Sequence, residues 1–231
     1  MNKITAILIA MCSVLIVPKS FAHKKMKYGL GVEFGYNHLT GVIAEELTHN
    51  GLSGNQFKQY SSASFSPFIY AQRNIINSHW MINFGLGYVG YHHYFDFKHQ
   101  HRYDSNINTS LKISWHYIQI PIALGYELKF NSHQSILFKM GPAVNILLKG
   151  KDNYLDIILE DIYVTYRKQL ISFHGFGSIA YQNQLKNNAL IQISPFVKYE
   201  LNAQHMLGWG FFKNLEKAKN LQIGLGVSYM F

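Results

Sequence analysis

The sequence predicts an all-β protein: an eight-stranded antiparallel transmembrane β-barrel with long extracellular loops and short periplasmic turns. Three observations support this prediction: a final segment that alternates apolar and polar residues, an apolar segment at the opposite end of the chain, and a regular order of long and short connections. A barrel strand alternates in this way because one of its faces meets lipid and the other meets the barrel interior.

Residues 221–231 show the clearest alternation. Apolar residues occupy every second position, with small or polar residues between most of them: Leu221, Ile223, Leu225, Val227, Tyr229 and Phe231. Because successive side chains of a strand point to opposite faces, one face of this segment is apolar along its whole length. The pattern resembles the C-terminal insertion signal of bacterial outer-membrane proteins, which ends in Phe. We expect Leu225, Val227, Tyr229 and Phe231 to form that signal.

An export signal is predicted over residues 1–22. Its apolar stretch, residues 4–17, is shorter than the roughly 20 residues that a membrane-spanning helix needs. Ala22 supplies the small residue that a signal peptidase recognises, so we expect cleavage between Ala22 and His23. The remaining residues, 23–231, are then the barrel domain.

Composition narrows the class of protein further. Cys12 is the only cysteine and lies in the predicted signal, so the mature chain has no disulfide and no cysteine-based site. Cys12 could mark a lipoprotein, but Met11 before it is not the small residue such anchors use. Aromatic residues make up 15% of the chain, which fits the two aromatic girdles of a membrane barrel.

The chain is basic, with a net charge of +9 that falls to about +7 when Lys3 and Lys19 leave with the signal. The Lys and Arg residues are scattered and form no dense patch. An exported protein is also not expected to meet nucleic acid, so we predict no nucleic-acid partner. Basic loops on an outer-membrane protein would instead lie against lipopolysaccharide phosphates.

Eight segments alternate in the manner of membrane strands. They are residues 28–37, 62–72, 80–91, a strand that ends with 118–128, then 136–148, 170–182, 189–200 and 221–231. The connections between them are alternately long and short, which is typical of an outer-membrane barrel with both termini in the periplasm. Strands of about ten to thirteen residues suit a tilted crossing of the hydrocarbon layer. A soluble sandwich, the alternative, would use shorter strands without this asymmetry.

Two of these strands contain a proline in related sequences, Ser66-Pro67-Phe68-Ile69 and Ser194-Pro195-Phe196-Val197. A proline cannot donate a hydrogen bond to a neighbouring strand. We therefore expect a local bulge or kink at Pro67 and at Pro195.

Two short motifs carry a resemblance to a known family. The first is Tyr117-Ile118-Gln119-Ile120-Pro121-Ile122, and the second is Gly141-Pro142-Ala143 at the start of the apolar segment that follows. They resemble consecutive strands of the PorT-like outer-membrane β-barrel family. The resemblance implies a small barrel in the outer membrane of a Bacteroidota-type, Gram-negative cell. It implies little about activity, and we do not transfer the namesake's role in a secretion system to this chain.

Charged residues occur on the polar faces of several predicted strands: Glu33, Glu127, Lys139, Lys198 and Glu200. The interior of an eight-stranded barrel is filled by side chains, and buried charges of both signs must pair or keep water. We therefore expect Glu33, Glu127, Lys139 and Lys198 to form a lumen charge network that packs the interior. A porin-type channel is disfavoured because it needs about sixteen strands.

The segment after the third strand is rich in histidine and is predicted to be a loop: His92, His93, His99 and His101, with Asp96 and Asp104 nearby. Imidazoles and carboxylates can bind metal ions. Their spacing here matches no recognised ligand motif, so we predict no metal site and no cofactor.

Two Ser-x-His pairs, Ser114/His116 and Ser172/His174, place a hydroxyl and an imidazole on one face of a strand. A lipid hydrolase could use such a pair, but it would also need a carboxylate and an oxyanion hole, which the sequence does not reveal. No catalytic residue is predicted.

The sequence thus predicts a non-enzymatic outer-membrane barrel that acts by loop-mediated binding, as a structural element, or as a secretion or envelope accessory. The alternatives are a lipid-modifying barrel enzyme and a narrow transporter of small solutes. The expected partners are outer-membrane lipid and lipopolysaccharide, and the barrel-assembly machinery during insertion.

Overall fold

The structure, a computed structural model, describes most of the predicted barrel domain. The described residues are 26–40, 56–75, 79–100, 106–153, 164–165, 171–202, 207–208 and 219–231. The predicted export signal and its cleavage site lie outside them. Within these ranges no helix is long and apolar enough to cross a membrane.

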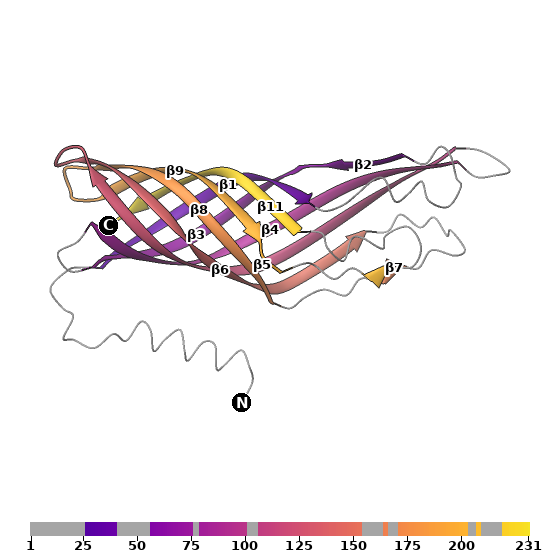
Figure 1. Cartoon of the computed structure of the whole chain (residues 1–231), viewed down its shortest axis with the longest axis horizontal. Coiled ribbons are helices and arrows are strands. Elements are labelled where there is room, and N and C mark those ends of the chain that lie inside the picture. The colour runs from indigo at the N-terminus through magenta and orange to yellow at the C-terminus, as the bar shows by residue number, and fades with distance from the viewer. Residues whose placement is uncertain are drawn as a thin grey trace, which may run out of the picture.

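Eight antiparallel strands close into a barrel (Figure 1). They are β1 (Lys27–Thr40), β3 (Ser62–Asn74), β4 (Trp80–Gln100), β5 (Asn106–Lys129), β6 (Gln134–Asn153), β8 (Ile171–Gln184), β9 (Leu190–Glu200) and β11 (Lys219–Met230). Each of them pairs with the next along the chain, and β1 pairs with β11 to close the barrel. The predicted eight-stranded antiparallel barrel is therefore confirmed.

Three shorter strands lie outside the barrel wall. β2 (Gln56–Tyr60) pairs with the outer part of β4, and β7 (Val164–Thr165) pairs with β10 (Leu207–Gly208). The two residues of β7 and of β10 form a separate two-stranded sheet.

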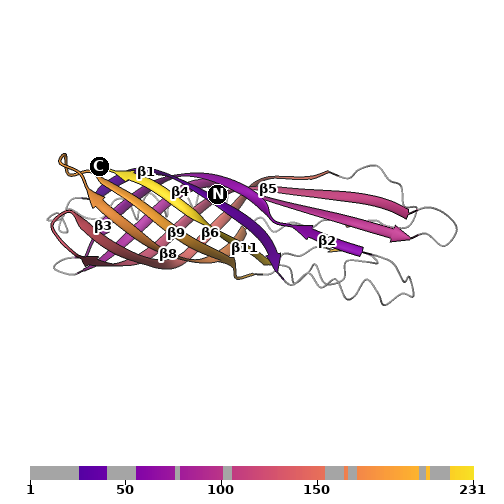
Figure 2. The same cartoon turned by 90° about the horizontal axis from the view of Figure 1, so that it is seen from above.

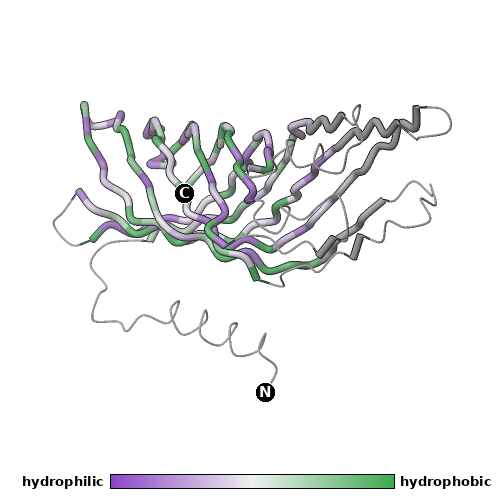
Figure 3. Tube along the Cα trace, turned by 45° about the vertical axis from the view of Figure 1, so that its right-hand side comes forward, coloured by the Kyte–Doolittle hydropathy of each residue, from purple (hydrophilic) through white to green (hydrophobic). Residues whose placement is uncertain are grey.

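Side chains of the wall alternate between the outer surface and the lumen, as the sequence predicts. In β11, the apolar Ile223, Leu225 and Tyr229 are exposed outward, whereas Gln222 and Met230 are buried in the lumen. Figure 3 shows the same alternation of hydrophobic and hydrophilic residues along the other strands. The outer surface is apolar because it faces the hydrocarbon chains of the lipid, where there is no water.

The two ends of the barrel differ in how the strands are connected. At one end, short turns join β3 to β4, β5 to β6, and β8 to β9, and the chain terminus lies at the same end. There the backbone of Phe231 exchanges hydrogen bonds of 2.7 and 3.1 Å with Tyr28. Asn188 adopts a positive φ of 64° in the last of these turns, a conformation that Asn tolerates better than most residues. In outer-membrane barrels the short turns and the termini are periplasmic.

Outward-facing aromatic side chains gather near both ends of the wall. Near the short turns they include Tyr28, Trp80, Phe138, Tyr181 and Tyr229, and near the opposite end Tyr36, Phe173 and Tyr199. Such girdles lie at the two membrane interfaces, where an aromatic ring meets both lipid tails and headgroups. Their positions define the part of the wall that spans the membrane.

Three neighbouring strands continue past the extracellular end of the wall. β8 stops pairing with β6 at Ile146–Ile171, but β6 runs on to Asn153 and stays paired with β5. β4 and β5 remain paired out to Gln100–Asn106, and β2 pairs with β4 at residues 94–98. We call residues 56–60, 94–100, 106–114 and 147–153 the extracellular extension (Figures 1 and 2). Seven residues of strand correspond to about 23 Å at roughly 3.3 Å per residue.

The prediction of a histidine-rich loop after the third strand was wrong. His92, His93 and His99 belong to β4, which continues to Gln100. β4 continues because β5 runs beside it and supplies a hydrogen-bonded partner at each of these positions. His101 and Asp104 lie outside the described residues.

Each of the two strand prolines interrupts pairing on one side of its strand: the β8–β9 pairs are missing at Pro195, and the β3–β4 pairing ends at Phe68–Gly87, beside Pro67. The register between β8 and β9 is the same at Ser178–Phe196 and at Tyr181–Ile193, on either side of Pro195. The pairing of β3 with β1 likewise continues through Val32–Pro67 without a shift. Each proline lacks one donor but keeps the extended geometry of the strand.

Candidate functional site

A chain of polar contacts crosses the middle of the lumen and joins five strands. Glu33 of β1 forms an ion pair with Lys198 of β9. Lys198 Nζ also donates to Gln119 Oε1 of β5 at 2.6 Å, and Gln119 Nε2 donates to Asn145 Oδ1 of β6 at 2.8 Å. Asn145 Nδ2 lies 3.4 Å from the hydroxyl of Tyr91 on β4. We call these five residues the lumen plug.

The charged half of the lumen plug is buried and held from several sides. The side chain of Lys198 is only 3% exposed, and its Nζ lies 4.7 Å from the ring centre of Phe68 and 5.0 Å from that of Phe196. Tyr70 donates to the Glu33 carboxylate at 3.3 Å. A buried ion pair offsets its desolvation only when further hydrogen bonds and aromatic faces surround it, which is the arrangement seen here.

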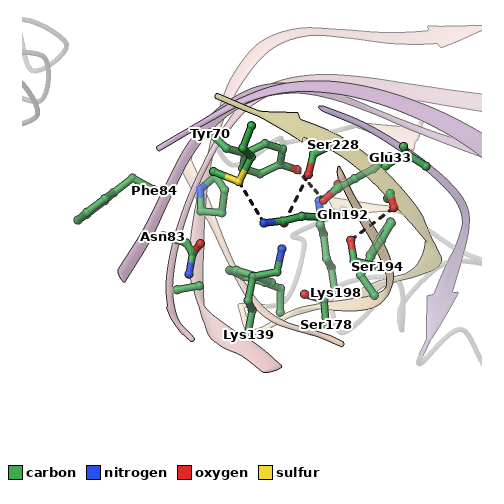
Figure 4. Close-up of a pocket in the computed structure, with 17 residues that line it drawn as sticks. Glu33, Tyr70, Asn83, Phe84, Lys139, Ser178, Gln192, Ser194, Lys198 and Ser228 are labelled. Atoms are coloured by element: carbon green, nitrogen blue, oxygen red, sulfur yellow. Dashed lines mark hydrogen bonds and ion pairs between the residues drawn. The ribbon is translucent and has the colours of Figure 1, made fainter. Parts of the chain in front are cut away.

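A small cavity of about 40 Å³ lies beside the lumen plug (Figure 4). Lys139 points into it, together with Ser178 and Gln192, and Glu33 and Lys198 form part of its wall. A volume of this size holds no more than a few water molecules. The cavity is therefore a small gap in the packing of the lumen, too small to contain a nutrient-sized solute.

The four residues of the predicted charge network are not all brought together. Glu33 and Lys198 are paired, and Lys139 faces the same cavity. Glu127 lies apart, near the short turns, where it accepts a hydrogen bond from Ser135 at 2.8 Å and lies 3.7 Å from Lys129. Glu200 also faces the lumen and accepts a hydrogen bond from the backbone of Asn220.

The lumen is filled above and below the plug as well. Near the short turns, buried Met81, Leu137 and Ala180 form an apolar cluster. Toward the extracellular end, the rings of Tyr91 and His174 are stacked with centroids 5.7 Å apart. Beyond them the rings of His93 and Trp115 are in contact, with centroids 5.3 Å apart. Side chains thus occupy the lumen at successive levels along the described barrel.

The two Ser-x-His pairs lie on opposite faces of the wall. Ser172 and His174 are both buried in the lumen, with Ser172 Oγ 3.3 Å from His174 Nε2, and Glu200 is the register partner of His174. Ser114 and His116 lie on the outward side of β5, where Ser114 is buried and His116 is half-buried. The imidazole bonded to Ser114 is that of His92 on β4, whose Nδ1 lies 2.9 Å from Ser114 Oγ.

In the described ranges, no three or more His, Cys, Asp or Glu side chains come together in a way that could hold a metal ion. His92 and His93, adjacent in sequence, point to opposite faces of β4: His93 is fully buried in the lumen, and His92 is on the outer surface. Alternation along a strand therefore separates the residues that the sequence places side by side.

The neutral members of the lumen plug, Gln119, Asn145 and Tyr91, were not among the predicted site residues. One signal could have found Gln119, because it lies on the lumen face of the strand that contains the Tyr117–Ile122 motif. An amide that alternates with Ile118 and Ile120 in a membrane strand must face inward and needs a partner there. Asn145 and Tyr91 could be linked to it only once the register of β4, β5 and β6 is known.

These features define the class of protein. A closed eight-stranded barrel with an apolar outer surface, aromatic girdles and a polar lumen is an integral outer-membrane β-barrel. Residues 23–231 match the sequence profile of a family described as the outer membrane protein beta-barrel domain. The chain belongs to this family and is located in the outer membrane.

Solved structures of similar shape are distant in sequence. OprG from Pseudomonas aeruginosa is 12% identical, with a TM-score of 0.46 over 89% of this chain and 97% of that one. The Neisserial surface protein A is 13% identical, with a TM-score of 0.46 over 90% and 99%. Ail, the attachment invasion locus protein of Yersinia pestis, is 8% identical, with a TM-score of 0.37 over 90% and 99%. No curated protein matches the sequence. Similarities this low carry no argument about function.

Proposed function

We propose that the protein is a non-enzymatic outer-membrane barrel that acts by binding through its extracellular extension. The observation that carries the proposal is the contrast between a filled lumen and three strands that continue beyond the wall. A strand needs only about ten residues to cross the membrane, so the additional residues of β4, β5 and β6 serve no purpose in spanning it. Extended strands hold a binding surface at a fixed height above the membrane, which a loop does less well.

A narrow transporter is less well supported by the lumen. Solute passage would require the ion pair between Glu33 and Lys198 to separate and the stacked rings of Tyr91 and His174 to move apart. Breaking a buried ion pair costs several kcal/mol for each passage. The charges are therefore better explained as packing.

A lipid-modifying enzyme is the second candidate, because one observation favours it. Ser114 Oγ and His92 Nδ1 lie 2.9 Å apart on the outward side of the wall, where Ser114 is buried and His92 is half-buried. The pair Ser172 and His174 is buried in the lumen and has no access to lipid. Mass spectra of lipid A from cells with and without the protein decide this alternative. A modification that disappears with Ser114→Ala would support the enzyme and contradict our proposal.

The binding role is tested by removing most of the part of the extracellular extension that β4 and β5 form. Tyr94 and Lys112 are direct register partners, so a two-residue Asn-Gly turn can join them in place of residues 95–111. We call this the trimmed variant. Intact and trimmed proteins, matched for outer-membrane amount, are cross-linked on whole cells, and the adducts are compared by mass spectrometry. We expect adducts that are lost on trimming; an identical adduct pattern in both proteins would contradict the proposal.

We also infer how the protein reaches and contacts the membrane. The alternating end of β11 supports an insertion signal read by the barrel-assembly machinery, formed by Leu225, Val227, Tyr229 and Phe231. Cleavage between Ala22 and His23 of a signal at residues 1–22 supplies the export step. The net charge of +9 supports contact of the extracellular rim with lipopolysaccharide phosphates. The motif at residues 117–122 supports placement in the PorT-like group.

A further inference from the structure

Three hydrogen-bond donors at the cavity beside the lumen plug find no acceptor among the described residues. They are Lys139 of β6, Ser178 of β8 and Asn83 of β4. Ser178 Oγ and Asn83 Nδ2 are buried without a hydrogen-bond partner. Lys139 takes part in none of the hydrogen bonds and ion pairs found within the described ranges. Because buried polar groups are normally paired, unused donors that gather at one cavity indicate a missing acceptor.

Strand pairing places the three donors side by side. Lys139 is the register partner of Ser178 on β8 and of Gly125 on β5, and register partners share one face of a sheet. Gly125 has no side chain, and the amide of Asn83 lies against it: Asn83 Nδ2 is 3.0 Å from the point that a Cβ on Gly125 would occupy. Figure 4 shows Lys139 extending into the cavity between Asn83 and Ser178. The three donors therefore approach one space from three strands.

Other polar groups of the cavity are already engaged in hydrogen bonds. The carboxylate of Glu33 is paired with Lys198 and accepts a hydrogen bond from Tyr70. Gln192 uses both its amide nitrogen and its amide oxygen in hydrogen bonds within the lumen. The wall of the cavity thus carries two ammonium groups and one carboxylate, so that the charge of Lys139 lacks a counter-charge of its own.

Lys139 also lies deep in the membrane-spanning part of the wall. It is near the middle of residues 134–146, the stretch of β6 that pairs with both β5 and β8. An uncompensated charge at this depth is costly, because neither bulk water nor a partner replaces its hydration. A counter-ion in the cavity would remove this cost.

We propose that the cavity holds one monatomic anion, of which chloride is the common example, bound by the Lys139 ammonium, the Asn83 amide and the Ser178 hydroxyl. Each of these groups can donate a hydrogen bond to an anion. A water molecule would accept from two of the donors but would leave the charge of Lys139 uncompensated. A cation is excluded because the two ammonium groups repel it. A volume of about 40 Å³ suits a single ion not much larger than a water molecule.

The test measures how chloride affects the stability of the full mature protein refolded in lipid vesicles. Urea unfolding midpoints are compared in sodium chloride, sodium bromide and sodium gluconate at one ionic strength and pH, because gluconate is too large for the cavity. An ion that binds only the folded barrel raises the midpoint as its concentration rises. We therefore expect higher midpoints in chloride and in bromide than in gluconate. X-ray diffraction of crystals grown with bromide should show its anomalous scattering beside Lys139, Asn83 and Ser178.

Lys139→Met keeps a long side chain but removes its charge, and should abolish the difference between chloride and gluconate. Ser178→Ala should keep the difference but require about tenfold more chloride, the effect of losing one hydrogen bond to a charged group. Lys129→Met is the matched control, because Lys129 is exposed near the short turns and lies outside the cavity. It should leave the difference unchanged. The trimmed variant keeps the cavity, so this test and the binding test of the extension fail independently. Equal midpoints in chloride and gluconate, or a chloride dependence in Lys139→Met as large as in Lys129→Met, would overturn the proposal.

Discussion

The barrel wall and the extracellular extension are parts of the same strands, but different physical requirements shape them. In the wall every strand is hydrogen-bonded on both sides, its outer face meets lipid and its inner face is packed in the lumen. In the extension, β6 has left β8, and β4 pairs with the short strand β2. The wall therefore carries the stability of the protein, whereas the extension is free to be shaped by binding.

The largest effect on the free energy of unfolding is expected from breaking the lumen plug inside the wall. Lys198→Met removes the partner of the Glu33 carboxylate and leaves that charge buried, which should lower the free energy of unfolding by about 3–5 kcal/mol. Guanidinium unfolding of the refolded protein in lipid measures the change. The double variant Glu33→Gln/Lys198→Met removes both charges and should recover much of the loss. A single variant as stable as the intact protein would show that the plug does not hold the wall together.

A smaller effect on stability, but a large one on assembly, is expected at the seam of the wall. Phe231 faces outward and closes β11 against β1 through its backbone contacts with Tyr28. Phe231→Ser should cost no more than the roughly 1–3 kcal/mol of one apolar side chain, so the protein should still refold into detergent. In cells its outer-membrane yield should fall sharply, as measured by immunoblots of membrane fractions. Normal accumulation of the variant would rule out the insertion signal.

The smallest effect on the free energy of unfolding is expected from the trimmed variant, although it lacks the most residues. The trimmed variant lacks residues 95–111 but keeps every pair between β4 and β5 from Trp80–Tyr126 to Tyr94–Lys112. Its free energy of unfolding should therefore stay close to that of the intact protein, measured in the same guanidinium titration. A loss comparable to that of Lys198→Met would mean that the extension supports the wall.

The same contrast explains how much could be predicted from the sequence. The wall could be predicted because the alternation of Ile223, Leu225 and Val227 with small or polar residues is imposed by lipid on one side. The extension was misread as loop at His92 and beyond, since outside the membrane no apolar face is required and the alternation is lost. Strand pairing alone maintains β4 there.

The lumen plug shows a second limit of prediction. Lumen-facing charges could be identified from strand parity, which places Glu33 and Lys198 inward. Their pairing depends on the positions of β1 and β9 around the closed barrel, separated by β11. Likewise, the contact between Gln119 and Asn145 follows from the direct pairing of these residues in β5 and β6, and the sequence alone does not specify that register.

Electrical conductance of the purified protein in planar bilayers tests whether the lumen is closed. Because the plug joins β1, β4, β5, β6 and β9 across the barrel, we predict no stable current steps of porin size for the intact protein. The trimmed variant should behave in the same way, since its lumen plug is intact. Stable, porin-sized steps from the intact protein would contradict the closed lumen. They would support transport through the barrel interior in place of the proposed binding by the extension.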